Sequence, residues 1–299
     1  MRQVALAFLV FIAVTWIGVA IVLKASEQSL IYIPGERVVP EPHPSLALRH
    51  RSIEFLTPDS ILLHAWIIPA ASASAASAAS AVSAASASSA SSASSAPSAF
   101  WLLIAHGNYG SIGFGDRPEF YAAARDIGLN LFAFDYRGFG RSDGRPGEEG
   151  IYRDAEAAYR YLVDSLQVPP QRIVLFGHSL GTGVVTELAT RVPSAALVLE
   201  AAYTSIPDVG AEAYPWLPVR LLAGERFETI ERIGKVTVPK LLLHSPEDEI
   251  VPFEHGRRVY EAASGAKRFV SVRRGHAGAF SEDREKYFGA IRELVEGLP

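Results

Sequence analysis

The stretch that decides the fold reads IVLFGHSLG and runs from Ile173 to Gly181. Its first four residues are apolar, which predicts a short strand buried on both faces. Because a helical pattern follows from Thr182 to Thr190, the residues between form a tight turn from a strand into a helix. Glycines on both sides let strand and helix pass closely, and the turn exposes the Ser179 hydroxyl at the amino end of the helix. A chance match in a glycine-bearing turn is the alternative, and the flanking strand and helix argue against it.

Short apolar runs and helical patterns alternate along the chain on both sides of this turn. Strands are expected at Trp101–Ala105, Leu131–Phe134, Ile173–Phe176, Ala196–Leu199, Leu241–Leu243 and Phe269–Val272, with two more within Ser52–Pro69 around a turn at Pro58-Asp59. Helices are expected at Ile151–Leu162, Thr182–Thr190, Phe253–Ala263 and Ser281–Leu298. Such alternation predicts a doubly wound α/β domain with a mostly parallel central sheet flanked by helices. Its functional residues are expected on loops at the carboxyl ends of the strands.

Ser179 is the predicted nucleophile, and a serine nucleophile needs a base that removes its proton. Three histidines follow it in the chain: His244, His255 and His276. His244 ends an expected strand, and His255 lies inside a helical pattern. His276 follows the strand Phe269–Val272 on a loop at that strand's carboxyl end, so it is the predicted base. An ordinary loop histidine is the alternative.

The base in turn needs an acid to orient it, and in this fold the chain order is serine, acid, histidine. Asp248 follows the strand Leu241–Leu243 and is the predicted acid, with Glu247 and Glu249 as neighbours. Glu200 ends the strand before that one and is the alternative acid. A carboxylate in such a loop is otherwise usually a solvated charge.

Two backbone amides are the predicted oxyanion-hole donors. One belongs to Leu180, the residue after the serine, and the other to Asn108 in the glycine-bearing loop His106–Gly110. A glycine-rich turn without a ligand is the alternative for that loop. The arginine-bearing segment Asp135–Ser142 is interpreted as a tight structural turn with paired charges rather than as an anion clamp.

The predicted substrate contacts come from the same loops and from the segment Ala201–Lys240, which is short enough to form only a small lid. Tyr109 and His178 adjoin the oxyanion loop and the serine. In the lid segment, Tyr214 and Trp216 either line an apolar acyl site or belong to a helix packed on the body, and the sequence favours neither reading.

Composition excludes several classes of function. The 299 residues carry a net charge of -4 and a pI near 6.1, whereas a nucleic-acid-binding protein calls for a basic surface. The chain has no cysteine, which rules out disulfides, a thiol nucleophile and thiolate metal sites. No metal-ligand spacing and no phosphate-binding loop occurs, so neither a metal nor another cofactor is predicted.

The N-terminal run from Val4 to Leu23 contains no charged residue and matches the thickness of a bilayer core. We interpret residues 1–24 as a single-pass membrane anchor. A cleaved signal peptide is the closer rival, although its apolar region is usually shorter, and a buried core helix would normally carry a polar stripe. The flanking charges, Arg2 and Lys24, leave the side of the membrane open, the extracytoplasmic side included.

The rest of the chain divides by composition. Residues 25–50 hold several prolines and are expected to form an irregular connector, and residues 51–299 form the α/β domain. Within it, residues 70–99 are almost only alanine and serine. Because this tract has no apolar stripe, it is interpreted as a poorly ordered surface insertion.

Taken together, these motifs resemble the membrane-anchored α/β hydrolases of the Bem46 and ABHD12/13/17-like group. The resemblance rests on the apolar N-terminus, Ser29–Pro34, the Asn108 loop, the Asp135–Ser142 turn, the serine turn, Tyr214–Pro218 and Asp248–Pro252. It implies a Ser179–Asp248–His276 triad and hydrolysis of ester, thioester or amide bonds. The chain differs from the family pattern after the histidine, where Ala277-Gly278 replaces a common Asn-Asp pair, and in its Ala/Ser tract.

The expected substrate is a small-molecule or lipid acyl compound, and the membrane is the expected partner of the N-terminal helix. A peptidase of the prolyl-oligopeptidase type is an alternative, but no propeller repeats are visible. An acyltransferase and a catalytically silent membrane scaffold are further alternatives. The oligomeric state is not predicted.

Overall fold

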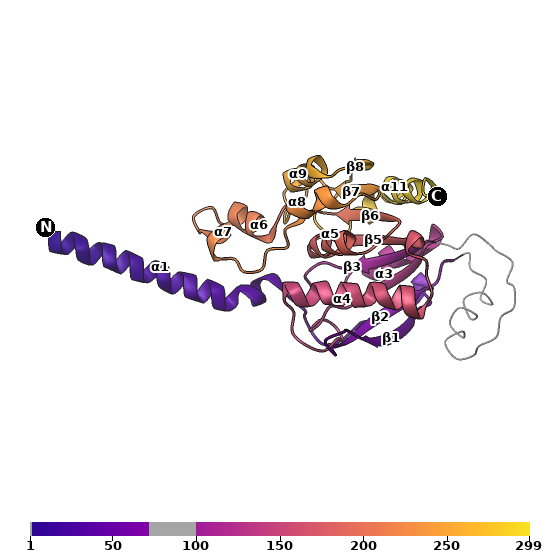
Figure 1. Cartoon of the computed structure of the whole chain (residues 1–299), viewed down its shortest axis with the longest axis horizontal. Helices are drawn as coiled ribbons and strands as arrows, with labels where there is room; N and C mark the ends of the chain where they lie inside the picture. Colours follow the sequence, from indigo (N-terminus) through magenta and orange to yellow (C-terminus); the bar gives the residue numbers. More distant parts are fainter. Residues whose placement is uncertain (1, 72–99) are drawn as a thin grey trace.

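The computed structural model describes residues 2–71 and 100–299, and its centre is one twisted eight-stranded sheet (Figure 1). The strand order is β1-β2-β4-β3-β5-β6-β7-β8. The six strands β4, β3, β5, β6, β7 and β8 pair in parallel. At one edge, β2 pairs antiparallel with β4 and β1 pairs antiparallel with β2. The predicted doubly wound α/β architecture is therefore confirmed.

The sheet strands and the helices have the following bounds. The strands are β1 Arg51–Leu56, β2 Leu62–Ile68, β3 Trp101–Ala105, β4 Asn130–Phe134, β5 Ile173–His178, β6 Ala196–Glu200, β7 Lys240–His244 and β8 Lys267–Ser271. The helices are α1 Arg2–Ile31, α3 Arg117–Asp126, α4 Glu148–Arg160, α5 Leu180–Arg191, α6 Ile206–Ala213, α7 Val219–Leu222, α8 Thr229–Arg232, α9 Phe253–Ala262, α10 Ala279–Glu282 and α11 Arg284–Glu296. Short helical turns lie at Pro44–Leu46, Tyr161–Ser165, Pro170–Arg172 and Ile233–Lys235.

The central strands are apolar because helices cover both faces of the sheet. Alternate residues of a strand point to opposite faces. In β5, for example, Leu175 packs with α4, α5, α8 and α9 on one face, whereas Val174 and Phe176 pack with α3, α10 and α11 on the other. This arrangement leaves the carboxyl ends of the parallel strands free to carry functional loops.

Two helices differ from the sequence-based expectation in their bounds, and α3, α6, α7 and α8 were not among the helices expected. Helix α1 continues to Ile31, into the predicted connector, because no proline or glycine lies between Lys24 and Pro34. The C-terminal helix is broken at Asp283, whose carboxylate accepts a hydrogen bond from the Arg273 amide and whose backbone is not helical. Helix α3 was missed because most of its middle is apolar and lacks a polar period.

The Ala/Ser tract cannot be compared with its prediction. Its first two residues, Ala70 and Ala71, follow β2, and residues 72–99 lie outside the residues that the structure describes. The interpretation of this tract as a surface insertion therefore stays a prediction.

Candidate active site

Ser179 lies at the turn between β5 and α5, as the sequence indicates. Its backbone has a φ of 51°, in the left-handed region that few non-glycine residues adopt. Added Cβ atoms on Gly177 and Gly181 would collide with the backbones of Gly181 and Ala105, respectively, so glycine is required at both positions. The Ser179 amide donates to the Glu200 carbonyl at 2.9 Å, which ties the turn to the next strand.

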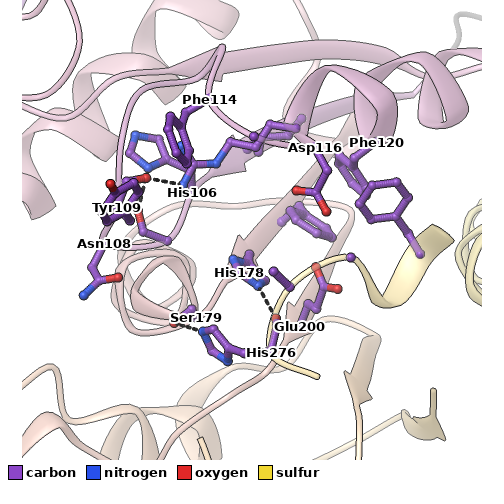
Figure 2. A pocket seen from close by; sticks show the side chains of 18 of the residues that line it. His106, Asn108, Tyr109, Phe114, Asp116, Phe120, His178, Ser179, Glu200 and His276 are labelled. Atoms are coloured by element: carbon purple, nitrogen blue, oxygen red, sulfur yellow. Dashed lines mark hydrogen bonds between the residues drawn. The ribbon is translucent and has the colours of Figure 1, made fainter. Parts of the chain in front are cut away.

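Three side chains from distant parts of the sequence form a hydrogen-bonded chain at this turn. The Ser179 hydroxyl lies 2.8 Å from His276 Nε2 (Figure 2). His276 Nδ1 lies 2.9 and 3.0 Å from the two carboxylate oxygens of Asp248. The structure thus brings together the predicted serine, base and acid, each on a loop at the carboxyl end of a strand.

Asp248 is held as an ionised acceptor. Its side chain is 1% exposed, and Oδ1 accepts hydrogen bonds from the amides of Ile250 and Val251 at 2.9 and 2.8 Å. Burial opposes ionisation, but the contacts with His244 and His276 outweigh it and hold the pKa of Asp248 below its ordinary value. A carboxylate in this state can orient the His276 imidazole through Nδ1.

Two neighbours hold the backbone of His276, and neither contact was foreseen. Glu249 accepts a hydrogen bond from the His276 amide at 2.9 Å, and His178 Nε2 donates to the His276 carbonyl at 3.1 Å. Burial lowers the pKa of His178 to about 3, so this ring is neutral at pH 7. These two contacts hold the His276 loop, in which the next two residues, Ala277 and Gly278, have no polar side chain.

The two predicted oxyanion donors flank Ser179. Leu180 is the first residue of α5, so its N–H has no acceptor within the helix. The loop carrying Asn108 passes so close that a Cβ on Gly107 would lie 3.5 Å from Ser179 Cβ. Within the described part of the chain, the Asn108 amide donates no hydrogen bond. Both amides therefore remain available beside the serine.

A cavity of about 400 Å³ opens beside Ser179 and His276. Its wall is largely apolar and includes Ile104, Phe114, Phe120, Tyr121, Phe176 and Phe280. Tyr109 and His178 also line it, in keeping with their predicted place near the substrate (Figure 2). The sequence did not single out Phe120 and Phe280, because α3 was not predicted and the predicted C-terminal helix began only at Ser281, after Phe280.

The structure does not bring Tyr214 and Trp216 to this cavity. They line a separate groove of about 450 Å³ that α6 and α7 form with the end of α1, and Trp216 is 68% exposed. The direction of these side chains depends on how the lid packs against α1, which extends further than the sequence suggested (Figure 1). The reading of Tyr214 and Trp216 as contacts of a substrate at Ser179 therefore has no support in the geometry.

The α/β-hydrolase family model matches residues 101–229. A Mycobacterium tuberculosis protein is 35% identical over 292 residues, which is 97% of this chain and 95% of that protein. The chain belongs to the α/β-hydrolase family.

Two further relatives of this α/β hydrolase confirm the resemblance to the ABHD group. Alpha/beta hydrolase domain-containing protein 17C of Xenopus laevis is 37% identical over 200 residues, and the lysophosphatidylserine lipase ABHD12 of Danio rerio is 34% identical over 185 residues. These matches span 67% and 56% of this chain but only 61% and 48% of the two relatives. Among solved structures, an esterase of Pyrococcus furiosus superposes with a TM-score of 0.67 at 19% identity, covering 89% of this chain and 97% of the esterase, which supports the fold.

The segment Asp135–Ser142 of this hydrolase is a structural turn and not an anion site. Asp135 is fully buried and accepts a hydrogen bond from the Ile112 amide at 2.7 Å. Arg137 pairs with Asp59 at 2.9 Å and with Asp154 at 2.8 Å. The paired charges agree with the interpretation made from the sequence.

Glu200, the alternative acid, lies on the cavity wall and makes no hydrogen bond with His276. Its side chain comes from the end of β6, one strand away from the loop that carries Asp248. Burial raises the pKa of Glu200 to about 8, and the charges of Asp116 and Asp248 act in the same direction. Glu200 is therefore a buried carboxylic acid at neutral pH rather than a partner of the histidine.

This raised pKa predicts that stability falls as the pH rises from acidic to mildly alkaline values. The folded protein keeps the Glu200 proton up to about pH 8, whereas an unfolded chain releases it near 4.5, so stability falls as pH rises between these values. We expect the Tm of the wild type to fall between pH 5.5 and 8.5 by about 5 °C more than that of Glu200→Gln. Calorimetry at both pH values measures this, and parallel pH dependence in the two proteins would contradict it.

Proposed function

We propose that this α/β hydrolase cleaves carboxylic ester, thioester or amide bonds through an acyl-enzyme on Ser179. The observation that carries the proposal is the continuous hydrogen-bonded chain from the Ser179 hydroxyl through His276 to Asp248. A serine is a weak nucleophile by itself and needs a base within this distance to remove its proton. The free amides of Asn108 and Leu180 supply the stabilisation of negative charge that acyl transfer needs.

The proposed reaction has two stages. Ser179 Oγ attacks the carbonyl carbon while His276 Nε2 takes the hydroxyl proton, and the oxyanion lies between the amides of Asn108 and Leu180. The tetrahedral intermediate collapses, His276 gives the proton to the leaving group, and the acyl group stays on Ser179. Water, deprotonated by His276, then releases the acid and restores the serine. Throughout, Asp248 accepts from His276 Nδ1 and stabilises the imidazolium.

The proposed substrate is a small-molecule or lipid acyl compound. Support comes from the largely apolar cavity of about 400 Å³ beside Ser179, which suits a hydrocarbon chain. Burial of each methylene contributes about 0.8 kcal/mol, so chain length is expected to affect KM. The names of two similar proteins, a lysophosphatidylserine lipase and an esterase, agree with this class.

Labelling with a fluorophosphonate probe tests the proposal, followed by hydrolysis of p-nitrophenyl esters from acetate to dodecanoate. We expect covalent labelling of the full-length protein in detergent and a kcat/KM that rises with chain length until the cavity is filled. The matching p-nitrophenyl amide and a thioester separate the three bond types. An intact, folded protein that neither labels nor hydrolyses any of these compounds would overturn the proposal.

We further propose that α1 anchors the enzyme in a membrane. Helix α1 is long and apolar enough to cross a bilayer, and large apolar side chains along it, from Val4 to Val22, are exposed. The helix projects away from the sheet (Figure 1). Exposure of this much apolar surface to water is unfavourable, and a bilayer removes it.

We expect the full chain to need detergent for extraction, and a chain that begins at Glu27 to be soluble and active. High-salt washing is the control for peripheral attachment. Membrane fractionation measures the first outcome, and intact-mass analysis of the native protein detects cleavage. A new N-terminus near Ala25 would identify a signal peptide instead.

A further inference from the structure

The residues that directly follow α1 pair with the loop that carries Asn108. Ile33 and Tyr109 form a parallel β-bridge, in which the Ile33 amide donates to the Asn108 carbonyl and the Gly110 amide donates to the Ile33 carbonyl, both at 2.9 Å. The Asn108 side chain adds a third contact, because Nδ2 donates to the Ile31 carbonyl at 2.8 Å. Three hydrogen bonds thus join two segments that lie far apart in the sequence.

The segment Ile31–Ile33 is itself fixed to the body of the enzyme. Tyr32 is 3% exposed, and its ring meets that of Phe227 edge to face. Its hydroxyl donates to Glu225 Oε2 at 2.6 Å, and the same oxygen accepts from the Glu148 amide at 2.6 Å. The end of α1 is therefore part of the packed structure and can hold another loop in place.

These contacts use the backbone carbonyl and the side-chain NH₂ of Asn108 and leave its backbone N–H free. The carbonyl accepts from Ile33, the side chain donates to Ile31, and the amide stays free beside Ser179. Glycines at 107 and 110 flank this residue, and glycine gives a loop more conformational freedom than any other residue. The peptide group that carries the Asn108 N–H is held on one side, where the Gly107 carbonyl accepts from His106 Nδ1 at 2.7 Å. The contacts with Ile31 and Ile33 hold Asn108 on the other side.

We propose that the segment Ile31–Ile33 is a positioning element of the oxyanion hole, so that the end of the anchor helix belongs to the active site. This inference rests on the proposed acyl-transfer function. A donor stabilises the oxyanion only if its hydrogen lies at the place where the charge develops. A displacement of about 1 Å can lower the rate about 100-fold, so a clamp on Asn108 has a direct effect on kcat.

Two substitutions in the full-length enzyme each remove one of the hydrogen bonds that hold Asn108 against Ile31–Ile33. Ile33→Pro deletes the N–H that donates to the Asn108 carbonyl, and Asn108→Ala deletes the side-chain donor to Ile31 but keeps the backbone amide. We expect kcat to fall by about 10- to 100-fold in each variant, with KM changed less than about threefold. Glu41→Pro is the matched control, because the Glu41 amide donates no hydrogen bond within the described residues.

A second readout separates positioning from general loss of structure. A trifluoromethyl ketone forms a tetrahedral oxyanion on the serine, whereas the carboxylic acid product binds without forming one. The inference requires that Ile33→Pro and Asn108→Ala weaken the ketone at least tenfold more than the product, at a Tm within a few degrees of the wild type. Equal weakening of both ligands, or an unchanged kcat in a folded variant, would overturn it. Failure of the wild type to hydrolyse any ester would instead refute the proposed function.

Discussion

Replacing Ser179 by alanine is expected to lower kcat for ester hydrolysis by about 10⁵- to 10⁶-fold and to abolish fluorophosphonate labelling. The substitution removes the oxygen that would form the acyl bond, and among residues 2–71 and 100–299 no other hydroxyl is hydrogen-bonded to His276 Nε2. Residual hydrolysis would come from the oxyanion donors and from substrate binding, which act without a covalent step.

The same variant is expected to keep its fold. Alanine loses one hydrogen bond, from the hydroxyl to His276, but the Ser179 amide still donates to the Glu200 carbonyl. The Tm should therefore stay within a few degrees of the wild type. Ser264→Ala is the control for the loss of a serine hydroxyl, since that hydroxyl donates to the backbone carbonyls of Gly234 and Val236 and lies away from the cavity. Labelling of Ser179→Ala at the wild-type rate would show that another residue is the nucleophile.

Asp248→Asn is expected to lower kcat by about 10⁴-fold, whereas Glu200→Gln should change it less than about tenfold. The reason lies in the two oxygens of Asp248. Oδ1 accepts from the amides of Ile250 and Val251, so the oxygen of an asparagine would take that place and its NH₂ would face His276. That NH₂ donates to Nδ1, leaves the imidazole proton on Nε2, and so prevents Nε2 from accepting the proton of Ser179.

Steady-state kinetics on a soluble ester, with Tm measured for both variants, test this comparison. Glu200→Gln is the control for replacing a buried carboxyl group by an amide on the cavity wall. An inactive Glu200→Gln together with an active Asp248→Asn would show that the acid has been misassigned. A large loss of stability in Asp248→Asn alone would be separated from the tautomer effect by measuring kcat at a temperature where the variant is folded.

The fold was predictable because the apolar runs and helical patterns that specify its strands and helices are each local in the chain. Apolar runs such as Leu241–Leu243 reflect burial on both faces of a parallel sheet, and every expected strand is present within a few residues. The helices were less predictable at their ends. The break at Asp283 has no strong local signal, because it accompanies a hydrogen bond from the distant Arg273 amide. The end of α1 lies near Pro34, a local signal that places a helix end only to within a few residues.

By itself, the sequence determined the place of Ser179 and reduced the candidates for its base and its acid to a few residues. The strand, the glycine-flanked turn and the helix are adjacent in the chain, so their spacing specifies the serine, and chain order points to His276. The choice between Asp248 and Glu200 was not decided in this way, because both follow neighbouring strands at the same edge of the sheet. The tertiary structure shows only Asp248 at His276 Nδ1.

Only the tertiary structure decided which other residues surround the serine. It separates Tyr214 and Trp216 from the cavity and directs them toward α1, since the packing of the lid determines their side-chain directions. It also joins Ile33 to the loop of Asn108 through backbone hydrogen bonds. Every residue except proline has the same backbone donor and acceptor, so a pairing between distant backbone segments leaves no mark in the residue types, and folding alone brings those segments together.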